Sequence, residues 1–395
     1  MNLVTGIRRG PTTLLSAGHG SVDLYQGVIA VLVPFLVTQR HYSYVAVSGF
    51  VLAATVLSSV VQPLFGLLTD RWQMRWLIPL SMLIAGIGVA LVGVMPNYLM
   101  TCVAVALSGI GVAAFHPEAA RLARVVTGGG PVGMSWFSVG GNIGFALAPV
   151  IATPVIALGG VSATPWLVVP SVIGAALVVP MLRRGRSTPG AGATARAGVD
   201  DWPAFGTLSA IIVVRSVAFT GISTFLGLFV QQRIPHGAAA SGIALFVLYA
   251  GGAVGTVLGG RCARRWGRLP TLRVAYLVGA VALAGVVLVP GPAVLVFVGA
   301  TSLALYAPFS LHITLGQDYL PNRVGTASGV TLGLAVSVGG AFAPALGALA
   351  QATSLQWTLA SLVVLPVLAA VLGRRLREPG LARPEKPDEA MAERA

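Results

Sequence analysis

Residues 76–95 read WLIPLSMLIAGIGVALVGVM, and residues 98–123, after Pro96 and Asn97, read YLMTCVAVALSGIGVAAFHPEAARLA. No charged residue stands between Arg75 and Glu118, and each run is about as long as the roughly 20 apolar residues that a helix needs to cross a bilayer. The rest of the chain is similar, because 56% of its 395 residues are hydrophobic and only 9% are charged. Soluble domains carry about 25% charged residues, so this composition excludes a soluble protein.

Apolar runs bounded by polar residues, Gly, Pro or Arg predict an all-α membrane protein with twelve transmembrane helices. The expected spans are 14–38, 43–69, 76–95, 98–123, 131–157, 164–182, 204–231, 238–262, 270–290, 292–316, 323–350 and 354–373. The only long polar interruption is 183–203, which divides the spans into two sets of six. We therefore expect a six-helix bundle at 1–182, a central loop at 183–203, a second six-helix bundle at 204–376 and a polar tail at 377–395.

The basic residues predict the orientation of these spans in the membrane. Of the 25 Lys and Arg residues, 22 fall on one side, Arg40 and Arg233 fall on the other, and Arg215 lies inside a span. The positive-inside rule then places both termini in the cytoplasm, in the cytoplasmic membrane of a bacterium. The net charge of +14 thus reports topology and contact with anionic lipid, and no nucleic-acid partner is expected.

Short internal repeats relate the two sets of spans. Gly66, Asp70 and Arg71 after the second span match Gly260, Arg264 and Arg265 after the eighth at an offset of 194. Residues 138–141, SVGG, recur as residues 337–340 at an offset of 199. Both offsets are close to half the chain, and parallel six-helix repeats of this kind are typical of the major facilitator architecture.

Only two acidic residues lie inside the expected spans, Asp23 in the first and Glu118 in the fourth. A charge at the centre of a membrane helix costs about 2.5–3.5 kcal/mol on insertion scales, so ionisable residues there indicate function. His19 lies four residues before Asp23 and hence on the same helical face. His116 stands two residues before Glu118, and Arg121 stands three after it.

The second half contributes Arg215 in the seventh span and His312 in the tenth, the counterparts of the first and fourth. Carboxylates and imidazoles in a partly dehydrated cavity can change their protonation state in the physiological range. These groups could therefore carry a proton, neutralise a charged solute, or do both. In the structural alternatives Glu118 pairs with Arg121, Asp23 is neutralised by His19 or Arg215, and His312 is a polar group satisfied inside the bundle.

The loop after the second span, from Gly66 through Asp70 and Arg71 to Arg75, is a candidate cytoplasmic gate. An acid beyond a helix end can accept hydrogen bonds from a neighbouring helix N-terminus or pair with a base, and such a contact can form in one conformation and break in another. The alternative is a turn with ordinary cytoplasmic arginines. Gly260 and Arg264 occupy the corresponding place in the second half.

The loop from Gly66 to Arg75 resembles the signature of the major facilitator superfamily between its second and third helices. The stretches His19 to Asp23, 115–124 (FHPEAARLAR), 139–142 (VGGN) and 317–325 (QDYLPNRVG) resemble the fosmidomycin-resistance branch of that superfamily, over residues 14 to 350. The resemblance implies twelve helices in two bundles and proton-driven efflux of a small solute by alternating access.

The sequence thus predicts a secondary transporter, a proton-coupled exporter of a small compound that could be anionic. Proton coupling is assigned to Asp23, Glu118, His19 and His116, and substrate binding to Arg215, Arg121, Gln26, Asn142 and His312. The expected partners are protons, the small-molecule substrate and the lipid bilayer, and we expect a monomer without cofactor or metal. The alternatives are an uptake or facilitative transporter for a metabolite and, more remotely, a non-transporting receptor or a membrane enzyme. An integral metalloenzyme would require His19, Asp23, His116 and Glu118 to converge on one metal.

Overall fold

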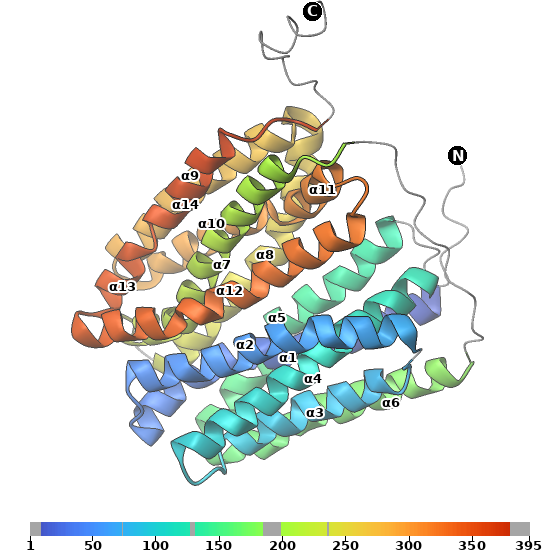
Figure 1. The fold of residues 1–395 in the computed structure, drawn as a ribbon. Helices are drawn as coiled ribbons and strands as arrows, with labels where there is room; N and C mark the ends of the chain where they lie inside the picture. Colours follow the sequence, from blue (N-terminus) through green and yellow to red (C-terminus); the bar gives the residue numbers. More distant parts are fainter. Residues whose placement is uncertain (1–8, 73, 127–130, 185–198, 235–236, 380–395) are drawn as a thin grey trace, which may run out of the picture.

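A computed structural model describes residues 9–72, 74–126, 131–184, 199–234 and 237–379, which form two helical bundles (Figure 1). Its first half consists of α1 (Arg9–Arg40), α2 (Tyr44–Arg71), α3 (Leu77–Val92), α4 (Tyr98–Val126), α5 (Pro131–Gly159), and the 3-10 helix η1 (Val161–Val168) continued by α6 (Val169–Arg184). Ser43 caps α2, because its side chain accepts a hydrogen bond from the Ala46 amide at 3.2 Å.

The second half repeats this order of elements. It consists of α7 (Trp202–Gln231), α8 (Gly237–Trp266), α9 (Arg268–Leu288), η2 (Gly291–Ala293) with α10 (Val294–Tyr306) and α11 (Phe309–Tyr319), α12 (Val324–Ala352), and α13 (Leu355–Ser361) with α14 (Val364–Gly373). The sixth, tenth and twelfth expected spans are thus each built from consecutive shorter helices. In the tenth, the break between α10 and α11 falls at Pro308, which has no main-chain N–H to continue the helical hydrogen bonds.

The helices are long and apolar enough for a membrane. Among the described residues, nine helical segments qualify as membrane spans by length and composition. Shorter apolar helices at Tyr44–Thr55, Leu77–Val92 and Val338–Ala352 occupy the three remaining expected positions. Large apolar side chains such as Leu158 and Val281 face outward, 90% and 72% exposed, as lipid contact requires. The all-α, twelve-helix prediction agrees with this arrangement.

The two halves pack by the same pattern. In the first, α1 packs on α5, α2 on α4 and α3 on α6, and in the second α7 packs on α12, α8 on α10 and α9 on α14. The repeated SVGG sequence lies at equivalent crossings. A Cβ atom at Gly140 would stand 2.1 Å from the carbonyl oxygen of Ser16 in α1, and one at Gly339 would stand 2.3 Å from that of Ser216 in α7. Only glycine permits these helices to approach so closely.

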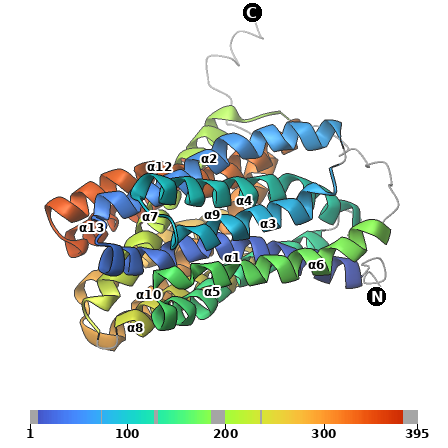
Figure 2. The same ribbon diagram turned by 90° about the horizontal axis from the view of Figure 1, so that it is seen from below.

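The halves meet along α2 with α12 and along α5 with α8, on opposite faces of the molecule (Figure 2). The Tyr44 amide donates to Gln351 Oε1 at 3.2 Å, Gln232 Nε2 donates to the Tyr44 hydroxyl at 3.2 Å, and the Phe145 and Tyr249 rings lie 5.4 Å apart. The two hydrogen bonds lie at the ends of α2, α7 and α12 that are remote from the described start of α1, and the ring contact lies near the middle of α5 and α8. Figure 1 shows α2 and α12 close together near α13 and farther apart toward their other ends.

Candidate functional site

Asp23 lies between two imidazoles in the first half. The Nε2 atom of His19, one turn earlier on α1, stands 3.2 Å from Asp23 Oδ2, and the Nε2 atom of His116 on α4 stands 3.2 Å from Asp23 Oδ1. Asp23 and His19 are only 6% and 7% exposed. The expected pairing of His19 with Asp23 on one helical face is therefore present, and α4 adds a second histidine to it.

Main-chain carbonyl groups orient both imidazoles. His19 Nδ1 lies 2.8 Å from the Phe137 carbonyl oxygen of α5, and the two rings stack with centroids 4.3 Å apart. His116 Nδ1 lies 2.8 Å from the Val112 carbonyl oxygen, one turn back on α4. Because a carbonyl oxygen only accepts hydrogen bonds, both Nδ1 atoms must donate, and this assigns the tautomers. Each neutral ring then turns the lone pair of Nε2 toward the carboxylate, and only a proton or another cation between them makes the contact attractive.

Gly141 on α5 closes the cluster from the third side. A Cβ atom at this position would lie 2.3 Å from Asp23 Oδ2 and 2.8 Å from both Cε1 and Nε2 of His19. Any side chain here would displace the carboxylate or the imidazole. The glycine of the VGGN sequence thus allows the α5 backbone to lie against both groups.

Glu118 is not part of the Asp23 cluster. Arg121 Nε donates to Glu118 Oε2 at 2.8 Å, and Arg121 Nη2 donates to Glu118 Oε1, so the pair is bidentate. Glu118 is 0% exposed. This is the i,i+3 pair that the sequence offered as the structural alternative for these two residues. The structure therefore brings together three of the four residues assigned to proton coupling.

Arg215 is the buried cation of the second half. Arg215 lies on α7, and its Nε donates a hydrogen bond to the Leu305 carbonyl oxygen of α10 at 2.7 Å. The guanidinium carbon stands 4.8 Å from the ring centroid of Tyr306, 5.3 Å from Phe309 and 5.8 Å from Phe219. Among the described residues no carboxylate lies within ion-pair distance of Arg215. The aromatic faces contribute part of the stabilisation that a counter-ion would otherwise provide.

A series of aromatic rings connects this cation to the boundary between the halves. Phe145 on α5 lies 5.4 Å from Tyr249 on α8, Tyr249 lies 6.3 Å from Phe219, and Phe219 lies 5.1 Å from Tyr306. Sequence reasoning missed these residues, because isolated aromatics in apolar spans show no spacing that separates them from core residues. Their only signal is that Phe219 stands one helical turn after Arg215.

The other residues assigned to substrate binding are more scattered. Gln26 and Asn142 are half-buried on α1 and α5. His312 on α11 is 2% exposed, and its Nε2 lies 3.0 Å from the Tyr276 hydroxyl of α9. His312 is therefore held in the interior of the second half through Nε2, whereas its buried Nδ1 has no hydrogen-bond partner among the described residues, so only half of its polar capacity is satisfied there.

The candidate gate is described only in part. The surroundings of Gly66, Asp70 and Arg71 lie outside the described part of the structure, and Arg75 is half-buried at the turn before α3. In the second half, a Cβ atom at Gly260 would meet nothing within 4 Å, and Arg264 is exposed in the last turn of α8.

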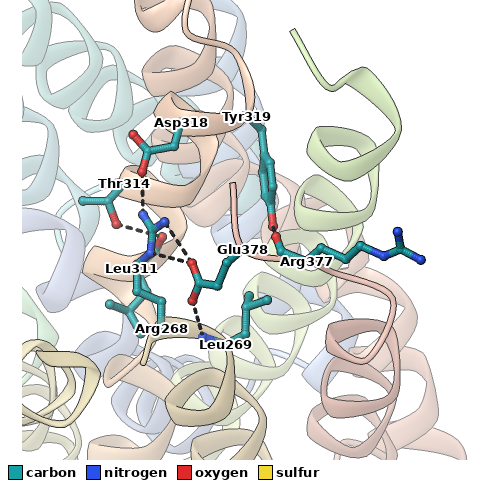
Figure 3. A network of polar contacts seen from close by, with 8 residues as sticks. All are labelled: Arg268, Leu269, Leu311, Thr314, Asp318, Tyr319, Arg377 and Glu378. Atoms are coloured by element: carbon teal, nitrogen blue, oxygen red, sulfur yellow. Dashed lines mark hydrogen bonds and ion pairs between the residues drawn. The ribbon is translucent and has the colours of Figure 1, made fainter. Parts of the chain in front are cut away.

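A polar network that the sequence analysis did not single out lies just beyond this turn (Figure 3). Arg268, the first residue of α9, donates to Asp318 Oδ2 at 2.6 Å and to Glu378 Oε2 at 2.9 and 3.1 Å. Glu378 also accepts from the Leu269 amide at 3.3 Å, and the Tyr319 hydroxyl donates to the Arg377 carbonyl oxygen at 2.6 Å. The segment after α14, which the sequence places in a polar tail, is thus attached to α9 and α11.

Two six-helix bundles that pack by the same pattern and hold buried ionisable groups are the architecture of a class of membrane transporters. The chain belongs to the Major Facilitator Superfamily, whose family model matches residues 15–344.

Curated relatives agree with this family. The fosmidomycin resistance protein of Escherichia coli (strain K12) is 27% identical over 368 residues, which cover 90% of this chain and 89% of that protein. The MFS-type transporter YfnC of Bacillus subtilis (strain 168) is 29% identical over 373 residues, covering 89% and 88%. The resemblance found in the sequence is thereby confirmed.

Solved structures share the fold at low sequence identity. A bacterial homologue of the human lysosomal transporter Spinster, in an inward-facing and occupied conformation, superposes with a TM-score of 0.76 at 17% identity, covering 94% of this chain and 97% of that one. A mutant of the nucleoside transporter NupG gives a TM-score of 0.74 at 12% identity, covering 92% and 98%.

Proposed function

We propose that this protein is a proton-coupled exporter of a small anionic compound, working by alternating access in a bacterial cytoplasmic membrane. The observation that carries the proposal is the buried Asp23 carboxylate between the Nε2 atoms of His19 and His116. The fosmidomycin resistance relative supports export over uptake, because removal from the cell is a common route to resistance.

The arrangement of lone pairs supports proton binding at this cluster. With both Nδ1 atoms donating to carbonyl groups, each contact between Nε2 and the carboxylate has room for one proton. A proton entering either contact replaces repulsion between lone pairs by a charge-assisted hydrogen bond. Asp23 and the two histidines are the proposed proton carriers, and Glu118 is reassigned to a structural pair with Arg121.

Arg215 is the proposed contact for the anionic group of the substrate. It is a buried cation whose neighbours are aromatic rings and one carbonyl group. Recognition of an anion by a guanidinium group is favoured where water is excluded, since the charge-assisted hydrogen bonds are stronger there. Gln26, Asn142 and the rings of Phe145 and Tyr249 would complete the walls of the site.

The contacts between the halves support a conformation open toward the termini, which the basic residues place in the cytoplasm. Tyr44, Gln351 and Gln232 join the halves at the opposite ends of their helices. In this conformation the proposed gate of Asp70 and Arg71, with Arg264 in the second half, would belong to the open side. A monomer suffices for this cycle, since both halves belong to one chain.

The test combines a screen with a vesicle assay. Cells expressing the protein are compared with control cells for resistance and accumulation across a compound panel that includes fosmidomycin and other phosphonate antibiotics. The compound selected is then assayed in proteoliposomes under an imposed pH gradient. Asp23→Asn is expected to abolish gradient-driven movement. The control His41→Asn should leave it intact, because His41 lies in an exposed loop with a φ of 55°, a conformation that asparagine also adopts.

The direction of movement separates export from uptake. Efflux of the compound against its concentration gradient while protons flow inward supports the proposal. Movement of the compound in the same direction as the protons indicates uptake instead. Unchanged gradient-driven transport in a correctly folded Asp23→Asn variant would refute the coupling assignment.

A further inference from the structure

The Asp23 cluster has the composition of a metal site as well as that of a proton site. His19, Asp23 and His116 each offer one ligand atom, and all three atoms lie within 4.8 Å of one another. Asp23 Oδ1 is buried and accepts no hydrogen bond from the described residues when His116 Nε2, 3.2 Å away, carries no proton. A buried carboxylate oxygen that faces a lone pair is destabilised unless a cation lies beside it.

The two imidazoles are prepared for coordination in the way that known metal sites prepare them. A histidine ligand generally donates its second ring N–H to a carbonyl or carboxylate group, which fixes the tautomer and leaves the other nitrogen free to bind metal. His19 does so to Phe137, and His116 does so to Val112, each at 2.8 Å. In their neutral forms both imidazoles therefore present the Nε2 lone pair toward Asp23 without any change of ring orientation.

The spacing suits a small transition-metal ion. Tetrahedral Zn²⁺ has ligands at about 2.0–2.1 Å, which places neighbouring ligand atoms about 3.3 Å apart. His19 Nε2 stands 3.2 Å from Oδ2 and His116 Nε2 stands 3.2 Å from Oδ1, so each imidazole has this spacing to one of the two carboxylate oxygens. Two imidazoles and one carboxylate are a donor set that suits zinc and leaves its fourth position open, whereas Mg²⁺ and Ca²⁺ prefer oxygen ligands alone.

We propose that His19, Asp23 and His116 form a binding site for a divalent transition-metal ion, with Zn²⁺ as the expected ion. Gly141 belongs to the site, because any side chain at this position would collide with the Asp23 carboxylate beside α5. A metal there would occupy the position between the carboxylate and both imidazoles, and would hold α1, α4 and, through the Phe137 carbonyl, α5 together. The proposal does not depend on proton coupling, since binding can be measured without substrate or gradient.

Co²⁺ is the probe for this site, because its visible absorption distinguishes tetrahedral from octahedral coordination. Full-length, tag-free protein in detergent is titrated with Co²⁺ alone, and Zn²⁺ is then added to displace it. We expect one tetrahedral Co²⁺ per chain, displaced by one Zn²⁺. His116→Gln should weaken binding at least about 100-fold, since loss of an outer partner alone costs 10–100-fold. His41→Asn is the matched control and should bind like the unaltered protein.

His116→Cys distinguishes a ligand from a structural residue. A thiolate at this position should restore binding and add a sulfur-to-cobalt charge-transfer band, which no structural role of His116 would produce. Thermal unfolding of each variant without metal verifies that it is folded. A purely octahedral spectrum, equal Co²⁺ affinity in folded His116→Gln, or a His116→Cys protein without the charge-transfer band would each overturn the site.

Discussion

Gly141→Ala tests the geometry of the Asp23 cluster without changing any charged group. The added Cβ atom would lie 2.3 Å from Asp23 Oδ2 and 2.8 Å from the His19 ring, whereas ordinary contacts begin at 3.4 Å. The carboxylate must therefore move by about 1 Å, and His19 is restrained by the Phe137 carbonyl group and by ring stacking. Overpacking of this kind costs about 1–3 kcal/mol.

A displacement of about 1 Å at a positioned reacting group can reduce the rate by about 100-fold. We expect Gly141→Ala to lower gradient-driven transport in proteoliposomes by about 10- to 100-fold, while the midpoint of thermal unfolding falls by only a few degrees. Gly206→Ala on α7 is the matched control, because its Cβ atom would meet nothing within 4 Å. That control should transport normally, and its helix should be slightly stabilised, since alanine favours helix over glycine by up to about 1 kcal/mol.

The reasoning fails if Gly141→Ala transports at the rate of Gly206→Ala. It also fails if Gly141→Ala loses transport only in proportion to unfolded protein, because the effect would then be general destabilisation.

Three further predictions concern the charged groups outside the Asp23 cluster. Arg215→Ala should raise the KM for an anionic substrate more than about tenfold. Arg215→Lys should raise it less, because a lysine keeps the charge but loses the planar guanidinium. Equal KM values for the unaltered protein and both variants would contradict this prediction. Glu118→Gln should destabilise the protein by up to about 3–5 kcal/mol, since it removes the charge of a fully buried carboxylate from its bidentate pair with Arg121, and the exposed quarter of the Arg121 side chain reduces this figure. Folded Glu118→Gln should retain gradient-driven transport in vesicles, unlike Asp23→Asn. Arg268→Ala should change the unfolding midpoint little, because ion pairs whose side chains are 25% and 33% exposed contribute about 1 kcal/mol or less. It should accelerate protease cleavage after α14, and unchanged cleavage would show that Glu378 does not hold this segment.

The fold was predictable because hydropathy and charge placement act on whole spans. Twelve apolar runs predicted helices that the structure shows at corresponding positions, and the SVGG repeat identified equivalent crossings of α1 with α5 and of α7 with α12. The divisions within the sixth, tenth and twelfth spans were not predictable from hydropathy, because such a break leaves the composition of the span unchanged.

The candidate site was predictable only along single helices. The spacing of His19 and Asp23 and of Glu118 and Arg121 gave both local pairs, since i,i+3 and i,i+4 neighbours share a helical face. The contact between His116 and Asp23 depends on how α4 is rotated against α1, which one sequence does not reveal. The aromatic surroundings of Arg215 depend in the same way on the packing of α7 against α10 and α11.

The Asp23 cluster is built entirely from the first half of the chain. Its three side chains, the two carbonyl groups that orient them and the glycine that admits them come from α1, α4 and α5. Arg215 and the rings around it come from α7, α10 and α11. On the assignments proposed above, the group that takes up protons and the group that contacts the anion therefore lie on different halves of the chain, and each can be exchanged without the other. If these assignments hold, a chimera that joins this first half to a relative's second half is expected to carry the relative's substrate and to keep the proton dependence proposed for Asp23.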